Sequence, residues 1–174
     1  MDELSAAEVP DDTGRVPFES FVAASGDRLL RTVYLLTRDH GLAEDLLQTA
    51  LTRSWPRWRR IDGDPEPYVR TILVRQNVSR WRVRRWRELT TDQLPERPAG
   101  GPDPDDRVLL HRALGTLAPR QRAVIVLRYF EDLTEAQTAE ALGIAVGTVK
   151  SQARDALRRL REVLPDLADV LVSP

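Results

Sequence analysis

Apolar residues recur three and four positions apart along most of the chain, the spacing of amphipathic helices. In the first half this pattern predicts helices over residues 17 to about 38, 42 to about 60 and 68 to about 89. Pro56 should kink or shorten the last turn of the second helix, because proline cannot donate a helical hydrogen bond. The apolar face predicted for this helix includes Trp55 and Trp58.

In the second half the same spacing predicts helices over residues 107–116, 119–130, 134–142 and 146–162. Residues 89–106 carry four prolines and two glycines without apolar periodicity, which is typical of a linker. Residues 1–16 have the composition of a disordered acidic tail, and residues 165–174 form a short C-terminal tail. With no strand pattern of any length, the sequence predicts an all-α fold of two small helical domains, 17–88 and 107–164, joined by a flexible linker.

Residues 134–161 have the pattern of a helix-turn-helix. Ala139 is small enough for two helices to cross closely, Gly143 can adopt the left-handed conformation that ends the first helix, and Val149 is an apolar plug. Thr134 and Gln137 fit a capping box at the start of the first helix. Ala145 is a poor N-cap for the second.

The second helix of this motif carries residue types suited to phosphates and base edges in a major groove. They are Thr148, Lys150, Ser151, Gln152 and Arg154, followed by Arg158. A plain packing hairpin is the alternative, but a solvated structural helix more often alternates its charges. The pattern favours DNA binding.

Composition limits the other classes of function. The formal net charge is −1, yet residues 53–87 carry eleven arginines and only three acids. The absence of cysteine and the wide separation of the two histidines argue against a disulfide framework or a metal site. No apolar run is long enough to span a membrane, and the acidic N-terminus is unlike a secretory signal, so a cytoplasmic protein without membrane insertion is expected. No catalytic constellation or phosphate loop is present, so neither enzymatic activity nor a cofactor is expected.

The third helix is the second candidate for nucleic-acid binding. Its segment 75–88 interleaves Trp81 and Trp86 with six arginines. Arginines neutralise phosphates, while exposed aromatic faces can stack on unpaired bases. Burial of both tryptophans in the core is the alternative that the sequence leaves open.

These features together resemble the extracytoplasmic-function sigma factors of the sigma-70 family, and among them the actinobacterial sigma-E-like branch. The resemblance covers about residues 17–164 and rests on LAEDLLQTAL at 42–51, LAPRQRAVIVLRYFEDLTEAQTAEALG at 117–143 and VGTVKSQ at 146–152. It implies a promoter-specificity subunit of bacterial RNA polymerase that recognises −35 and −10 elements and assists strand opening. The first domain would be sigma region 2 and the second would be region 4.

The resemblance also implies roles for individual residues. Docking on the core polymerase would involve Glu44, Asp45 and Gln48, with Arg53 and Arg57 nearby. Glu44 and Asp45 could instead simply complement the helix dipole. Contacts to the −10 element would come from a loop at residues 61–67 and the following helix, at Asp62, Gly63, Asp64, Tyr68, Arg75, Asn77, Arg80, Trp81 and Arg84. Arg75 stands where the family commonly has Asn, which leaves the base preference there open.

Contacts to the −35 element would come from Thr148, Lys150, Ser151, Arg154 and Arg158, with Arg120 and Arg122 reaching the DNA backbone. The 18-residue linker can span at most about 60 Å. Promoter elements about 17 base pairs apart lie roughly 58 Å from each other along the DNA axis, so the two spans are compatible.

Two other classes of function are weighed against a sigma factor. A stand-alone helix-turn-helix regulator that binds duplex DNA without polymerase would leave residues 42–51 and the basic aromatic helix unexplained. A protein-interaction module is disfavoured by the arginine clusters. Partners expected from the resemblance are the polymerase core, promoter DNA and, as a hypothesis, an anti-sigma factor wedged between the domains.

Overall fold

The computed structural model describes residues 16–88 and 105–165, without side chains for residues 82–88 and 105–107. Every regular element in these ranges is helical. The elements are α1 (Phe18–Thr37), α2 (His40–Ser54), η1 (Trp55–Arg60), α3 (Glu66–Glu88), α4 (Asp105–Gly115), α5 (Pro119–Ile125), η2 (Val126–Phe130), α6 (Glu135–Leu142) and α7 (Val146–Val163). The predicted all-α fold is confirmed. The predicted linker and both tails lie almost wholly outside the described residues.

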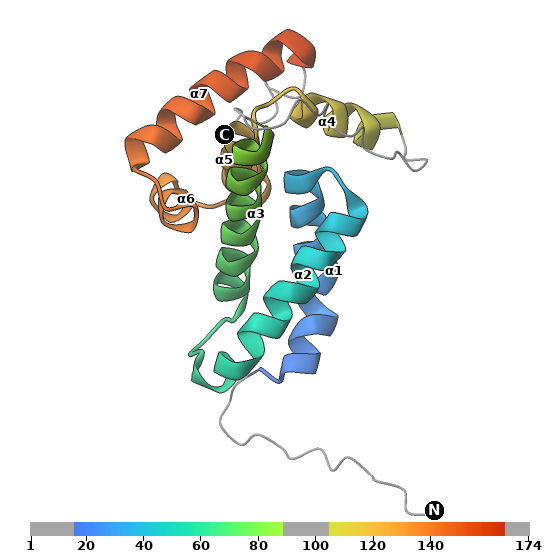
Figure 1. Cartoon of the computed structure of the whole chain (residues 1–174), viewed down its shortest axis with the longest axis vertical. Helices are drawn as coiled ribbons and strands as arrows, with labels where there is room; N and C mark the ends of the chain where they lie inside the picture. The colour runs from blue at the N-terminus through green and yellow to red at the C-terminus, as the bar shows by residue number, and fades with distance from the viewer. Residues whose placement is uncertain (1–15, 89–104, 166–174) are drawn as a thin grey trace, which may run out of the picture.

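The first helical unit is formed by α1, α2, η1 and α3, with α1 and α2 lying side by side along α3 (Figure 1). Leu29, Val33, Leu46 and Leu73 are among the residues that form its core. Trp58 is also buried there, as predicted. Trp55 differs from the prediction, because its side chain is 58% exposed at the point where α2 gives way to η1.

The ends of these helices follow from capping. The Asp39 carboxylate accepts a hydrogen bond from the Leu42 amide at 2.9 Å, so α2 begins at His40, two residues earlier than expected. Proline at position 56 ends α2 at Ser54, and the chain continues as the 3₁₀ helix η1. Helix α3 also begins early, at Glu66, because the Asp64 carboxylate accepts from its amide at 2.9 Å. The predicted loop 61–67 is therefore a loop only over residues 61–65.

The second helical unit is formed by α4 to α7 and contains the predicted helix-turn-helix in α6 and α7. Gly143 ends α6 with a φ of 64°, in the left-handed region. Thr134 and Gln137 form the reciprocal capping box, with bonds of 3.2 and 2.8 Å. Val149 is fully buried and Ala139 is nearly so. The geometry of the motif is confirmed. The expected helix 119–130 instead changes into the π-helical turn η2 at Val126.

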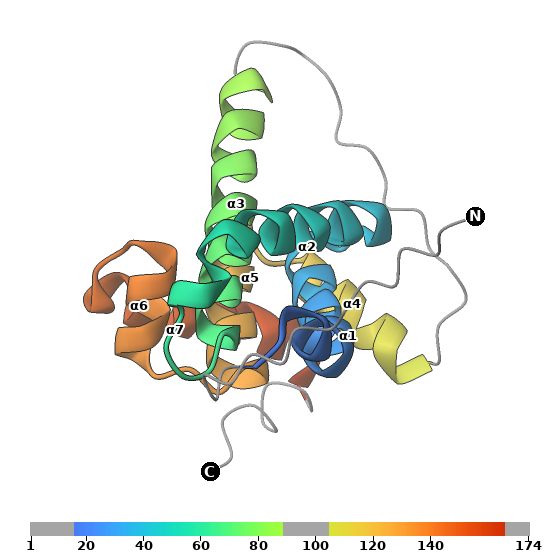
Figure 2. The ribbon, with the colours of Figure 1, turned by 90° about the horizontal axis from the view of Figure 1, so that it is seen from below.

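One hydrophobic cluster spans both units, which the sequence did not predict. Leu36 of α1 and Val74 of α3 belong to the same buried cluster as Leu114, Ile125 and Leu127 of the second unit. Helix α3 also packs against α6. Figures 1 and 2 show α3 between the α1–α2 pair on one side and α6 on the other. In this structure the two units are docked on each other.

Candidate nucleic-acid interface

Helix α7 has one buried side and one basic side. Val149, Ala156 and Leu160 are fully buried against the rest of the second unit. Lys150, Arg154 and Arg158 are exposed, and their four-residue spacing places them on one face of the helix. Their existing partners are weak and exposed: Lys150 lies 3.5 Å from Glu135, and Arg158 lies 3.3 Å from Asp155. Such pairs are easily exchanged for phosphates.

Two smaller polar residues of the −35 set lie beside this basic face. Thr148 and Ser151 are half-buried, and the Ser151 hydroxyl donates to the Thr148 carbonyl at 3.0 Å. Both belong to the first two turns of α7, the part of a recognition helix that meets base edges. The structure therefore gathers five predicted −35 residues on one accessible stretch of α7.

Helix α7 starts without a side-chain cap. Its N-cap residue Ala145 has extended backbone angles (φ −71°, ψ 148°) that a capping serine also adopts. Replacing Ala145 by serine should add a hydroxyl acceptor for the Thr148 amide and raise the free energy of unfolding by about 1 kcal/mol. Chemical denaturation followed by circular dichroism measures this. The matched control is Ala136→Ser, at an exposed position within α6, which should give little change. An equal effect of both variants would contradict the capping argument.

Arg120 and Arg122, predicted to reach the DNA backbone, are both engaged within the protein. The Arg120 guanidinium carbon lies 5.3 Å from the centre of the Trp81 ring. The Arg122 guanidinium donates to the carbonyls of Leu114, Leu117 and Leu36 at 2.9 to 3.1 Å. In this arrangement both guanidinium groups contact other groups of the protein, and their contacts with the DNA backbone stay a prediction.

The bond from Arg122 to Leu36 has an electrostatic reason. Leu36 lies in the last turn of α1, where carbonyls carry partial negative charge and where α1 has no basic residue of its own. Burial, together with the smaller effect of the nearby Arg38, lowers the pKa of Arg122 to about 10. The guanidinium thus stays protonated at neutral pH and caps α1 from the other helical unit.

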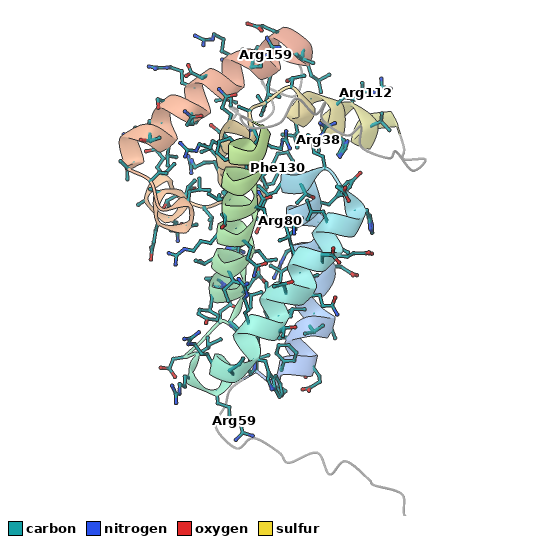
Figure 3. The ribbon with its side chains drawn as sticks, viewed as in Figure 1. Arg38, Arg59, Arg80, Arg112, Phe130 and Arg159 are labelled. Atoms are coloured by element: carbon teal, nitrogen blue, oxygen red, sulfur yellow. The ribbon has the colours of Figure 1, made fainter. Side chains whose placement is uncertain are left out.

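The loop at residues 61–65 lies at the tip of the first unit. Asp62, Gly63 and Asp64 are exposed, and Gly63 has a φ of 75° that favours glycine. Because the Asp64 carboxylate caps α3, only part of its hydrogen-bonding capacity remains for a base. Tyr68 is half-buried and packs against the core of the first unit. Arg59 of η1 lies at this tip, at the opposite end of the molecule from Arg159 of α7 (Figure 3).

Helix α3 presents its predicted −10 residues on two sides. Arg75 and Arg80 are exposed, whereas Asn77 and Trp81 are half-buried. Asn77 and Trp81 line a cavity of about 120 Å³ that is closed from the other side by Arg120, Gly143 and Ile144 of the second unit, among others. The sequence left open whether the two tryptophans are buried in the core. Trp81 is half-buried and lines this cavity. Arg84 lies on α3, but its side chain, like that of Trp86, is outside the described ones.

The predicted polymerase-binding residues form an accessible face of α2. Glu44, Asp45 and Gln48 are exposed, while Ala43, Leu46 and Ala50 on the opposite side are buried. The Glu44 carboxylate lies 3.2 Å from Nδ1 of His40, an exposed contact one turn away. Arg53 and Arg57 extend the exposed surface into η1. The face is thus free of interactions that would compete strongly with a protein partner.

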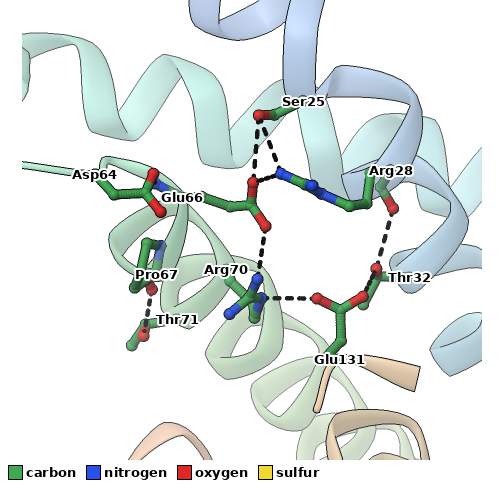
Figure 4. A network of polar contacts seen from close by, with 9 residues as sticks. All are labelled: Ser25, Arg28, Thr32, Asp64, Glu66, Pro67, Arg70, Thr71 and Glu131. Carbon is green, nitrogen blue, oxygen red and sulfur yellow. Dashed lines mark hydrogen bonds and ion pairs between the residues drawn. The ribbon is translucent and has the colours of Figure 1, made fainter. Parts of the chain in front are cut away.

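A buried polar network that sequence reasoning missed lies between these surfaces (Figure 4). Glu66 accepts from Ser25 at 3.3 Å, from Arg70 at 2.6 Å and from Arg28. Arg70 also pairs with Glu131 of the second unit at 2.9 Å. The four-residue spacing of Glu66 and Arg70 is the only local sequence pattern in this network. Its other pairs are up to 99 residues apart in sequence and leave no pattern from which the contact could be predicted.

Over the described ranges, no helix is long and apolar enough to cross a membrane. The same ranges contain no group of three or more His, Cys, Asp or Glu side chains arranged to hold a metal ion.

Comparison with known proteins gives consistent matches over both helical units. The family model for sigma-70 region 2 matches residues 21–87, and that for sigma-70 region 4 matches residues 107–160. The RNA polymerase sigma-E factor of Streptomyces coelicolor is 43% identical over 151 residues, covering 84% of this chain and 85% of that protein. The ECF RNA polymerase sigma factor SigL of Mycobacterium tuberculosis is 35% identical over 148 residues, covering 80% of this chain and 84% of that protein.

Two solved structures are similar in fold. One is the sigma factor RpoE in complex with the anti-sigma factor NepR from Bartonella quintana, with a TM-score of 0.67, 26% identity and coverage of 85% of this chain and 96% of that chain. The other is CnrH in complex with the cytosolic domain of CnrY, with a TM-score of 0.60 and 20% identity. The match covers 86% of this chain and 88% of that chain. The second shows likeness of fold alone.

Proposed function

The chain belongs to the sigma-70 family as an RNA polymerase sigma factor, and we propose that it directs the core enzyme to promoters through α7 at the −35 element and α3 at the −10 element. The assignment to the family rests on matches to two of its regions and on a sigma-E factor that is 43% identical. The roles of individual residues rest on the geometry of this chain. Chemistry would belong to the polymerase, and this protein would supply recognition and strand-melting contacts in the cytoplasm.

The basic face of α7 is the observation that most strongly supports the proposed −35 contact. Lys150, Arg154 and Arg158 follow one line on a helix whose opposite side is anchored by the core. A rigid helix with such a line can lie in a major groove and contact base edges with its first turns. Arg154, in the middle of the line, is assigned to base recognition, and Arg158, farther along, to phosphate.

The proposed −10 contact uses the loop at residues 61–65 and the exposed side of α3. A base flipped from the non-template strand needs a stacking surface and groups that bond its edge. Asp62 and Gly63 are exposed in this loop, and Tyr68 lies in the first turn of α3 beside it. We assign Arg75 and Arg80, which are both exposed, to the phosphates of the opened strand.

We assign polymerase docking to the exposed face of α2 around Glu44, Asp45 and Gln48. The acidic residues lie in the first two turns of α2, where they also complement the helix dipole. An anti-sigma factor is proposed as a further partner, since the similar RpoE chain was solved in complex with one.

The requirement for polymerase separates this proposal from a stand-alone regulator. The purified chain should bind duplex promoter DNA tightly and with sequence preference only after core polymerase is added. Duplexes are first selected with the complex of the chain and core enzyme. Fluorescence anisotropy of these labelled duplexes then measures the affinity of the chain with and without core enzyme. Tight sequence-specific binding by the chain alone, unchanged by core enzyme, would favour the stand-alone regulator.

A further inference from the structure

The loop at residues 61–65 is anchored at both of its ends. Ile61 at its start is half-buried and packs against the core of the first unit. Pro65 at its end is buried, and so is Glu66, the first residue of α3. The three residues between these anchors are exposed. How firmly each anchor is fixed therefore decides how precisely the exposed part of the loop is placed.

The Glu66 carboxylate lies at the centre of the second anchor (Figure 4). It accepts hydrogen bonds from Ser25 at 3.3 Å and from Arg70 at 2.6 Å, and it pairs with Arg28. The Glu66 side chain is only 7% exposed. A buried carboxylate is costly unless it is paired and hydrogen-bonded, and here donors from α1 and α3 surround it. Burial of Glu66 is therefore compensated only while these donors keep their places.

These contacts tie the end of the loop to α1. Ser25 and Arg28 belong to α1 and lie 41 and 38 residues from Glu66 in sequence. The anchor at Ile61 packs through apolar contacts, which are not directional. Hydrogen bonds to a charged group are about twice as strong as bonds between neutral groups, and they require a defined geometry. The Glu66 carboxylate is thus a directional link between the loop and the framework of the first unit.

The backbone at Glu66 fixes the last residues of the loop. The Glu66 amide donates to the Asp64 carboxylate at 2.9 Å, and the Val69 amide donates to the Pro65 carbonyl at 3.1 Å. These bonds form the start of α3, where the helix dipole also favours a negative charge. A displacement of Glu66 is therefore passed directly to Asp64, and through it to the rest of the exposed loop.

We propose that Glu66 is a positioning residue for recognition of the −10 element. Its carboxylate, held by Ser25 and Arg28 of α1, sets where the loop at residues 61–65 stands against the flipped base. Because Glu66 is buried, it acts through the exposed residues of the loop rather than by contact with DNA. This role rests on the proposed function of the loop, whereas the anchor itself is a property of the free chain.

Hydrogen exchange of the free chain, followed by mass spectrometry, tests the anchor without DNA or polymerase. Glu66→Gln keeps the shape of the side chain and removes the charge that pairs with Arg28 and Arg70. Because hydrogen bonds to charged groups are among the stronger ones, the amides of residues 66–73 should exchange about tenfold faster, and those of α2 should be unchanged. Glu19→Gln makes the same charge change at an exposed position in the first turn of α1 and should leave exchange unchanged.

The effect on recognition is measured by transcription with core polymerase on promoters substituted one base pair at a time. A displaced loop should weaken discrimination within the −10 element alone, because α7 is untouched by the change. A mismatched base pair typically costs about fivefold or more in affinity, so we expect Glu66→Gln to lower −10 discrimination by about fivefold. Discrimination within the −35 element should be retained. A mere loss of folded protein would instead lower initiation at all promoters by one common factor.

A second variant keeps the test decisive if Glu66→Gln does not fold. Ser25→Ala removes one hydrogen-bond donor to Glu66 from a buried position of α1, and alanine is a good helix former. It should speed exchange in residues 66–73 and weaken −10 discrimination in the same direction as Glu66→Gln, by a smaller factor.

The two measurements separate this inference from the proposed function. If the unmodified chain initiates, unchanged exchange or unchanged −10 discrimination in the folded variants would overturn the positioning role. If the unmodified chain directs no initiation, the proposed function fails and the role in recognition falls with it, whereas the anchor stands or falls by the exchange measurement alone.

Discussion

Asp45→Arg is expected to lower the affinity of this chain for core RNA polymerase by about a hundredfold or more. Asp45 lies in the middle of the exposed acidic face of α2, next to Glu44. Reversing a charge within a protein interface places like charges together and costs several kcal/mol, and each 1.4 kcal/mol corresponds to a factor of ten. Competition against a labelled sigma factor for core enzyme measures the loss without involving DNA.

Asp27→Arg is the matched control for this prediction. Asp27 is an exposed acid on α1 of the same unit, outside the proposed docking face. It should retain the affinity of the parent chain within a few fold. Because Asp45 is exposed and has no buried partner in the structure, the thermal stability of both variants should be similar. Equal losses in both variants would show that net charge, rather than the α2 face, governs docking.

Arg154→Ala is expected to reduce initiation at promoters that depend on their −35 element by about 5- to 150-fold. Arg154 is exposed in the middle of the basic line on α7. A good bidentate contact to a base contributes about 1 to 3 kcal/mol of discrimination, which converts to this range. Runoff transcription with promoters substituted one base pair at a time measures both the loss and the position that becomes tolerant.

Arg159→Ala provides the control on the same helix. Arg159 is exposed but lies off the line of Lys150, Arg154 and Arg158, and its guanidinium lies 3.3 Å from Glu162. Its loss removes one positive charge from α7 without removing a proposed base contact. A uniform decrease across all promoter variants for both substitutions would assign Arg154 to phosphate rather than to a base.

The helices and the helix-turn-helix were predictable because their signals are local. Gly143 with its positive φ, the Thr134–Gln137 capping box and buried Val149 all follow from residue type and spacing within 16 residues. The early start of α3 was missed because the sequence does not show which of the acids near residue 64 caps a helix. The exposure of Trp55 was missed because helical periodicity was extended past Pro56 into a 3₁₀ turn.

The docking of the two units could not be predicted from the sequence. Glu131 and Thr32 are 99 residues apart, and neither belongs to a pattern that indicates a partner. Leu36 and Val74 complete a cluster with residues of the second unit, and no spacing in the sequence indicates that contact. The predicted DNA roles of Arg120 and Arg122 followed from the family resemblance and from their position at the start of a helix, whereas their partners here depend on tertiary contacts.

In vitro transcription with purified bacterial core polymerase, with and without this chain, on a library of randomised upstream DNA tests the central claim most directly. The account predicts new start sites that appear only with the chain and share paired −35 and −10 elements at a fixed spacing. Specific binding of the chain to duplex DNA, without any chain-dependent start site on the library, would contradict it.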